Sequence, residues 1–208
     1  MSAGASPLDA ARVLSQDDGA RLVAFARQAL ELYLRSGRTI GPLVGGAFGE
    51  RRGVFCTLHT HPEGVLRGCV GLPYPDKPVG EAVISAALGA ASDPRFPPLR
   101  LKELSRVAVE VSVLTLPEEV RAASHDDYPS AVRPGVDGLI LRCGHRAGLL
   151  LPQVWESLPD PMEFLATLCY KAGIARADAW RDAEARLYRF HAQVFAEQSP
   201  KGAVTEVS

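Results

Sequence analysis

The stretch VLRGCVGL at residues 65–72 decides how this chain is interpreted, because it has the pattern of a strand with two unequal faces. Side chains alternate along an extended chain, so Arg67 and Cys69 share one face. The other face carries three apolar side chains, Leu66, Val70 and Leu72. Gly68 and Gly71 flank the cysteine and remove side-chain bulk beside its sulfur. A guanidinium two residues from a thiol can favour the thiolate, so we predict a reactive Cys69 in an accessible groove. The alternative is that Cys69 packs as a small buried hydrophobe.

The composition bounds the class of protein. A chain of 208 residues suits one domain or two unequal lobes, and 47% hydrophobic residues are enough for a core. The net charge is −1 and no Lys/Arg cluster occurs, which argues against sequence-independent binding of nucleic acid. No apolar run is long enough to span a bilayer. We expect no secretory signal, and the four cysteines form no Cys-x-x-Cys pair, so we predict reduced thiols in a cytoplasmic protein.

Hydrophobic periodicity indicates helices over residues 17–36 and 79–92. Strands are expected over residues 53–60 and 65–72, joined into an antiparallel hairpin by a turn at residues 61–64. The clearest strand covers residues 107–116, where valines alternate with Ala108, Glu110 and Ser112. Further expected elements are a hairpin over residues 139–151, a helix over 162–170 and one long strand over 185–197. Because these elements do not alternate strictly as β-α-β, we predict an α+β fold with a mainly antiparallel sheet flanked by helices.

Several motifs in one order resemble those of the AMMECR domain family. Residues 65–71 are similar to that family's Leu-Arg-Gly-Cys-Ile-Gly signature, with valine in place of the commoner isoleucine at position 70. Residues 93–99 (DPRFPPL), 109–114 (VEVSVL) and 148–154 (GLLLPQV) resemble its later motifs. The resemblance covers about residues 17–197.

The resemblance implies a two-lobed α+β fold in which the signature strand lines a cleft. It also implies kinship with protein A of the AmmeMemoRadiSam system, whose domains occur beside a Memo-like protein and a radical S-adenosylmethionine protein. We therefore expect a single domain with two unequal lobes over residues 16–198. A flexible arm is expected at residues 1–15 and a disordered tail at residues 199–208.

Two further residues are candidates for proton transfer beside Cys69. A nucleophile needs a nearby base, and His59 lies on the preceding strand close to the turn. The alternative for His59 is a solvated histidine at a sheet edge. Glu110 lies among valines on a half-buried strand, where a carboxylate must pair or stay wet. Glu110 is therefore a candidate general acid or base, or the partner of an arginine.

Arg67 and Arg95 are candidates for binding an anionic substrate, because a guanidinium holds a carboxylate or phosphate through two parallel hydrogen bonds. The alternative is a structural ion pair, for instance with Asp93 or Glu110. The prolines around Arg95 favour this structural role.

The residues His59, His61, Glu63 and Cys69 form a loose metal-like cluster in the sequence. Pro62 bends the chain among them, and no second ligand pair has a recognisable spacing. We predict no metal site, and the sequence identifies no cofactor.

These candidates predict an enzyme, or a component of an enzyme system, that acts on a small anionic molecule. Cys69 would carry the chemistry, His59 or Glu110 would move protons, and Arg67, Gly68, Gly71 and Arg95 would contact the substrate. The alternative is a non-catalytic module that binds a ligand in the same groove, or a scaffold for the Memo-like and radical S-adenosylmethionine proteins.

Overall fold

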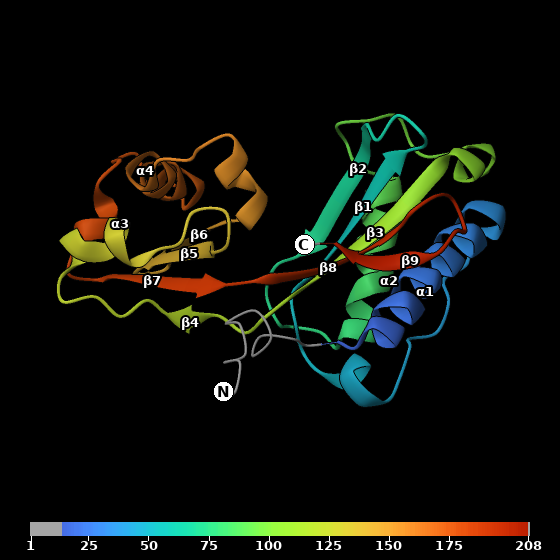
Figure 1. The fold of residues 1–208 in the computed structure, drawn as a ribbon, viewed down its shortest axis with the longest axis horizontal. Coiled ribbons are helices and arrows are strands. Elements are labelled where there is room, and N and C mark those ends of the chain that lie inside the picture. Colours follow the sequence, from blue (N-terminus) through green and yellow to red (C-terminus); the bar gives the residue numbers. More distant parts are fainter. Residues whose placement is uncertain (1–13, 208) are drawn as a thin grey trace, which may run out of the picture. The chain divides into compact units, whose positions relative to one another are not determined.

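The computed structural model describes residues 14–207, which divide into two compact units (Figure 1). Of the described residues, unit 1 comprises 14–115 and 193–207, and unit 2 comprises Leu116–Ala192. Each unit has its own sheet and its own apolar core. The predicted α+β fold with antiparallel pairing and flanking helices is confirmed.

Unit 1 contains a five-stranded sheet in the order β2-β1-β3-β8-β9. Its strands are β1 (Val54–Thr60), β2 (Leu66–Leu72), β3 (Val107–Leu114), β8 (Ala192–Glu197) and β9 (Val204–Val207). Its helices are α1 (Gln16–Ser36), α2 (Val79–Ala91) and the short 3₁₀ segments η2 (Gly46–Gly49) and η3 (Leu101–Arg106). The pairs β1–β2 and β1–β3 are antiparallel, as the predicted hairpin requires.

Helix α1 begins and ends where its sequence predicts. The Ser15 side chain accepts a hydrogen bond from the Asp18 N–H, and Asp17 and Asp18 place negative charge in the first turn. Gly37 ends the helix with a φ of 70°, and its N–H donates to the Tyr33 carbonyl. These caps satisfy backbone groups at both ends of α1.

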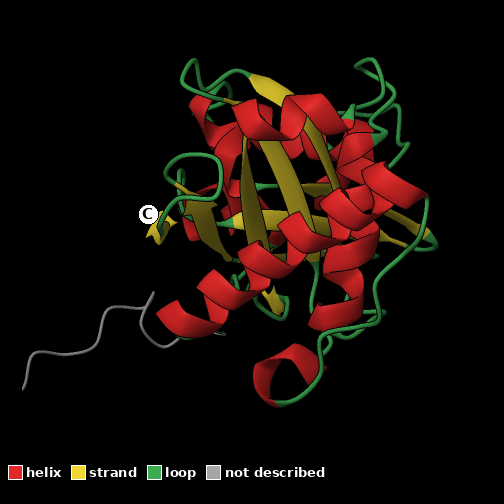
Figure 2. Ribbon diagram, turned by 90° about the vertical axis from the view of Figure 1, so that its right-hand side faces the viewer, coloured by secondary structure: helices red, strands yellow, loops and turns green. Residues whose placement is uncertain are grey.

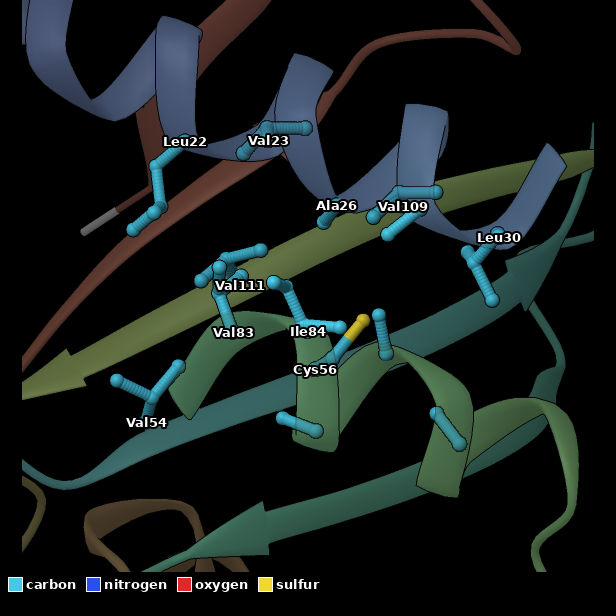
Figure 3. Packing of buried hydrophobic residues seen from close by; sticks show 14 of the residues in the cluster. Leu22, Val23, Ala26, Leu30, Val54, Cys56, Val83, Ile84, Val109 and Val111 are labelled. Carbon is cyan, nitrogen blue, oxygen red and sulfur yellow. The ribbon is translucent and has the colours of Figure 1, made fainter. Parts of the chain in front are cut away.

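Helices α1 and α2 cover one face of the unit 1 sheet, which we call the helix face (Figure 2). Side chains from both helices and from alternate positions of β1 and β3 meet between the layers (Figure 3). Members of this core include Leu22, Ala26, Leu30, Val54, Cys56, Val83, Val109 and Val111. Burial of this apolar area supplies the main stabilisation of unit 1.

A buried ion pair crosses the helix face. Arg27 of α1 donates from Nε and Nη2 to the Glu197 carboxylate of β8. Glu197 also accepts the Val109 N–H at 2.9 Å, and Arg27 Nη1 reaches the Leu104 carbonyl at 3.2 Å. These hydrogen bonds join α1, η3, β3 and β8.

Unit 2 contains a four-stranded sheet in the order β4-β7-β5-β6. Its strands are β4 (Glu118–Glu119), β5 (Gly138–Cys143), β6 (Arg146–Leu150) and β7 (Ala185–Phe190). Its helical segments are η4 (His125–Asp127), α3 (Tyr128–Ala131), η5 (Pro152–Glu156), α4 (Pro161–Lys171) and η6 (Ala179–Arg181). Helix α4 packs on β5 and β6, and the rings of Trp155 and Phe164 stack with centroids 3.7 Å apart.

The C-terminal segments differ from the sequence-based expectation. The single strand expected over residues 185–197 is broken at His191, so that β7 joins the sheet of unit 2 and β8 joins that of unit 1. The tail expected to be disordered contains β9, which pairs antiparallel with β8 in the register Val194↔Val207. Pairing with β8 satisfies the backbone groups of a segment whose own sequence carries little apolar content.

The N-terminal arm expected at residues 1–15 lies outside the described residues up to position 13. Leu14 is buried, and its N–H donates to the Gln193 side chain at 2.9 Å. Residues 14 and 15 are therefore held by β8 and by the cap of α1. No helix among residues 14–207 has both the length and the apolar character that crossing a bilayer requires.

Candidate functional site

A row of polar side chains crosses three strands on the face of the unit 1 sheet opposite the helices, which we call the polar face. The register places Cys69 of β2 opposite Thr57 of β1, and Thr57 opposite Glu110 of β3. Side chains directly opposite one another on adjacent strands lie close enough to interact. The Thr57 hydroxyl lies 3.4 Å from the Cys69 sulfur, so the row from Cys69 to Glu110 is joined through Thr57.

Glu110 and His59 form a pair at one end of this row. The Nε2 atom of His59 lies 3.8 Å from an oxygen of the Glu110 carboxylate. Burial raises the pKa of Glu110 above its ordinary value, while the nearby His59 and hydrogen bonding with Thr57 act to lower it. A carboxylate whose pKa is raised by burial holds a proton more readily and is suited to acid–base work.

A pocket of about 320 Å³ lies beside this pair. Its wall includes His59, His61 and Glu110 together with residues of the turn after β1 and of the end of β8. Cys69 is half-buried and does not line this pocket. This pocket is therefore not the groove predicted at Cys69: it opens next to Glu110 and His59, while the sulfur lies across Thr57 from them.

The backbone of Cys69 is held from outside the sheet by the loop after α2. Because β2 is an edge strand, its outward N–H and C=O groups have no neighbouring strand to bind. The Cys69 N–H donates to the Asp93 carboxylate at 2.9 Å, and Arg95 Nη2 donates to the Cys69 carbonyl at 3.1 Å. Asp93 and Arg95 thus replace the missing strand at this position.

Asp93 and Arg95 also bind each other. Arg95 donates to the Asp93 carboxylate from Nε and from Nη2, the latter at 2.7 Å. The Arg95 guanidinium and the Cys69 N–H hold the pKa of Asp93 well below its usual range. The structural interpretation of Arg95 is therefore the one that its contacts support, with Asp93 as the partner expected from the sequence.

Arg67 makes an ion pair that the sequence analysis did not identify. Its Nε and Nη2 both donate to Glu103 of η3 at 3.1 Å. Glu103 also accepts the Arg100 N–H at 2.8 Å, so its carboxylate links η3 to β2. The expected partners Asp93 and Glu110 are engaged elsewhere, and the Arg67 side chain is 14% exposed. The structural alternative for Arg67 is therefore the one that its contacts support, with Glu103 as the partner.

The two glycines of the signature make room for protein atoms. A Cβ on Gly68 would lie 2.2 Å from the Ala90 carbonyl oxygen of α2, so Gly68 permits the close approach of β2 to that helix. A Cβ on Gly71 would lie 2.2 Å from the ring of Phe55, its cross-strand neighbour. The sequence had led us to expect open space beside the sulfur at these two glycines. Protein atoms fill the space at both positions instead.

The structure brings Cys69, Glu110 and His59 onto one face, but it does not bring His59 to the sulfur. The Nε2 atom of His59 faces Glu110. Its Nδ1 atom lies 3.3 Å from the Gly64 carbonyl oxygen. The residue that sequence reasoning missed is Thr57. Its signal was present in the alternation of β1, which places Thr57 and His59 on the same face.

No group of three or more His, Cys, Asp or Glu side chains within residues 14–207 is arranged to hold a metal ion. The four cysteines are free thiols, of which Cys56 and Cys169 are buried. Burial raises the pKa of the Cys56 thiol far above its ordinary value. Cys56 lies on the helix face and takes no part in the polar row.

Comparison with known proteins supports a relationship over nearly the whole chain. The chain is 44% identical over 197 residues to a protein of Methanocaldococcus jannaschii, covering 94% of this chain and 98% of that one. It is 49% identical over 188 residues to a protein of Methanothermobacter thermautotrophicus, covering 88% and 96%. The crystal structure of an uncharacterized protein from Pyrococcus horikoshii matches with a TM-score of 0.83 and 41% identity, covering 94% of this chain and 99% of that chain. A family model described as AMMECR1 matches residues 23–195, and the chain belongs to the AMMECR1 family.

Proposed function

We propose that this protein is an enzyme, or the catalytic component of an enzyme system, that uses Cys69 as a nucleophile toward a small molecule. The observation that carries the proposal is the continuous polar row Cys69–Thr57–Glu110, which ends at a pocket lined by Glu110 and His59. A thiol, a hydroxyl and a carboxylate in this order can move a proton away from the sulfur.

The hydroxyl of Thr57 is both a donor and an acceptor, and its proton can rotate between partners. When Thr57 donates to the Glu110 carboxylate, its oxygen can accept the thiol proton of Cys69. In the proposed step the sulfur attacks an electrophilic carbon, an S–C bond forms, and the bond to the leaving group breaks. The thiol proton passes to Thr57 while the Thr57 proton passes to Glu110, whose raised pKa suits it to receive a proton.

His59 completes the proposed path. It lies 3.8 Å from the Glu110 carboxylate and lines the same pocket. A histidine in this position can take the proton onward from Glu110 or deliver it to the departing group. Arg67 and Arg95 have no part in binding substrate in this proposal, because Glu103 and Asp93 occupy their guanidinium groups.

The proposal is tested with p-nitrophenyl acetate, an activated ester that reports on a thiol nucleophile. We expect stoichiometric release of p-nitrophenolate together with an acetylated Cys69, identified by peptide mass spectrometry. Cys69→Ser should abolish this release and Thr57→Val should slow it. Cys143→Ser is the matched control, because Cys143 is also a half-buried free thiol but belongs to unit 2.

Two outcomes would overturn the proposal. Acetylation at Cys143 in preference to Cys69 would show that Cys69 has no special reactivity. Equal release from wild type and Thr57→Val would remove the proton path. A non-catalytic binding module would give this pattern, since its Cys69 only packs.

A further inference from the structure

One cavity of unit 2 has a volume of about 860 Å³ and plays no part in the function proposed above. It is lined by residues that follow β4, by η4 and by the segment between η6 and β7. All of its lining residues belong to unit 2, so it is formed within one compact unit. Its volume lies in the range of small-molecule sites.

The charged side chains of this cavity are three arginines and two carboxylates. Arg181 pairs with Asp126 at 2.6 Å, and Arg186 lies 3.7 Å from Glu119. The third arginine, Arg121, is exposed and has neither an ion pair nor a hydrogen bond within the described part of the chain. The cavity therefore has one guanidinium more than its carboxylates balance.

A second observation points to the same charge. Arg142 of β5 lies directly opposite Arg186 of β7 in the register of the sheet. Like charges at directly opposed positions destabilise a sheet. The Arg142 guanidinium is held 5.4 Å above the Tyr188 ring centroid, which keeps it beside this strand pair. Arg186 also pairs with Glu119 and donates to the Ala183 and Ala185 carbonyls, so an anion in the cavity would offset the charge that Arg142 adds to this strand pair.

The remaining wall offers a less polar surface. Val120, Tyr128 and Ala183 line the cavity, and Tyr128 stacks with His125 at a centroid distance of 5.2 Å. Val120 is fixed because its N–H donates to the Leu187 carbonyl at 2.8 Å, beyond the end of β4. This contact holds the start of the segment that carries Arg121 alongside β7.

We infer that this cavity of unit 2 binds a small molecule bearing a phosphate group, and that Arg121 makes the principal contact with the phosphate. A phosphate carries more than one negative charge and several acceptor oxygens, which match the Arg121 guanidinium in a cavity also lined by Arg186 better than a single carboxylate does. This site is separate from the polar row of unit 1 and does not depend on the reactivity of Cys69.

The test is isothermal titration calorimetry of the full chain with pyrophosphate at low ionic strength, with acetate as the comparison anion. Arg121→Ala should weaken pyrophosphate binding by about tenfold, as expected when a hydrogen-bonded charge is removed. Lys171→Ala is the matched control, because it removes an exposed positive charge from α4, away from the cavity, and should leave affinity within about twofold. Cys69→Ser should bind as wild type does.

Several results would overturn the inference. Absence of measurable pyrophosphate binding at low salt would do so, as would acetate binding as tightly as pyrophosphate. Equal loss of affinity in Arg121→Ala and Lys171→Ala would indicate attraction to net charge alone. Arg121 is exposed, so the variant is expected to fold, and a circular dichroism melt matching wild type would confirm it.

Discussion

Two cysteines on neighbouring strands of unit 1 differ in everything but residue type. Cys56 on β1 points to the helix face, where it is fully buried and its thiol pKa is raised by that burial. Cys69 on β2 is half-buried on the polar face and contacts the Thr57 hydroxyl. Cys69 lies opposite Thr57, the residue that follows Cys56 in β1. Because side chains alternate along a strand, this offset of one residue puts the packing thiol and the candidate nucleophile on opposite faces.

The same contrast holds for two carboxylates. Glu197 is buried on the helix face and is bound by Arg27 and by the Val109 N–H. Glu110 on the polar face is half-buried, the basic side chain beside it is a histidine 3.8 Å away, and burial raises its pKa. The helix face satisfies its polar groups and stabilises the fold. The polar face keeps a carboxylate in a state that costs stability but suits proton transfer.

The largest expected effect lies on the helix face. Glu197→Ala leaves the buried Arg27 guanidinium without its carboxylate, and we expect a loss of about 3–5 kcal/mol in the free energy of unfolding. The measurement is urea denaturation followed by circular dichroism. Glu31→Ala, which breaks the exposed pair with Lys201, is the control and should cost less than about 1 kcal/mol. Similar losses in the two variants would mean that the helix face does not depend on its buried pair.

A smaller loss is expected where β2 approaches α2. Gly68→Ala would place a Cβ 2.2 Å from the Ala90 carbonyl oxygen, so the strand must shift, at a cost of about 1–3 kcal/mol. Gly41→Ala is the matched control, because its Cβ would meet nothing within 4 Å. Both are measured by thermal unfolding. If Gly68→Ala were as stable as Gly41→Ala, the close approach of β2 to α2 would not require a glycine at position 68.

Asp93 gives the third prediction, through pH. Its pKa is lower in the folded protein than the unfolded value of about 4, so its contribution is fully present above about pH 4 and is lost as the pH falls further. Asp93→Asn should therefore cost on the order of 1 kcal/mol at neutral pH, and the difference from wild type should shrink on acidification. Denaturation at about pH 7 and about pH 3 measures it. If the difference in unfolding free energy between wild type and Asp93→Asn did not change with pH, the hydrogen bond from the Cys69 N–H would not depend on the charge of Asp93.

Much of the fold could be predicted from local pattern. The apolar stripe and caps of α1, the alternation of β3 and the hairpin of β1 and β2 each follow from residues within one element. The break at His191 could not be foreseen, because residues 188–194 alternate without interruption across it and the change of sheet is decided by tertiary pairing. Strand β9 likewise depends on β8, which is its partner in the sheet.

The candidate site was predicted in its residue types but not in its connections. Cys69, Glu110 and His59 could be placed on the polar face by alternation alone. The role of Thr57 as the link required the register of both strand pairs, which a sequence does not fix. The partner of Arg67 is Glu103, which is 36 residues away in the chain, and no local rule connects the two.

The most direct test of this contrast uses Glu110→Gln. Because the pKa of Glu110 is raised in the folded protein, its ionised form opposes folding, so stability increases as the pH falls through that pKa. Replacing it with glutamine should leave the unfolding free energy at neutral pH unchanged or slightly higher. The same variant should slow the alkylation of Cys69 by iodoacetamide, while the alkylation of Cys143 in the same molecule stays constant. Unchanged alkylation of Cys69, or a loss of stability in step with a loss of reactivity, would contradict the account.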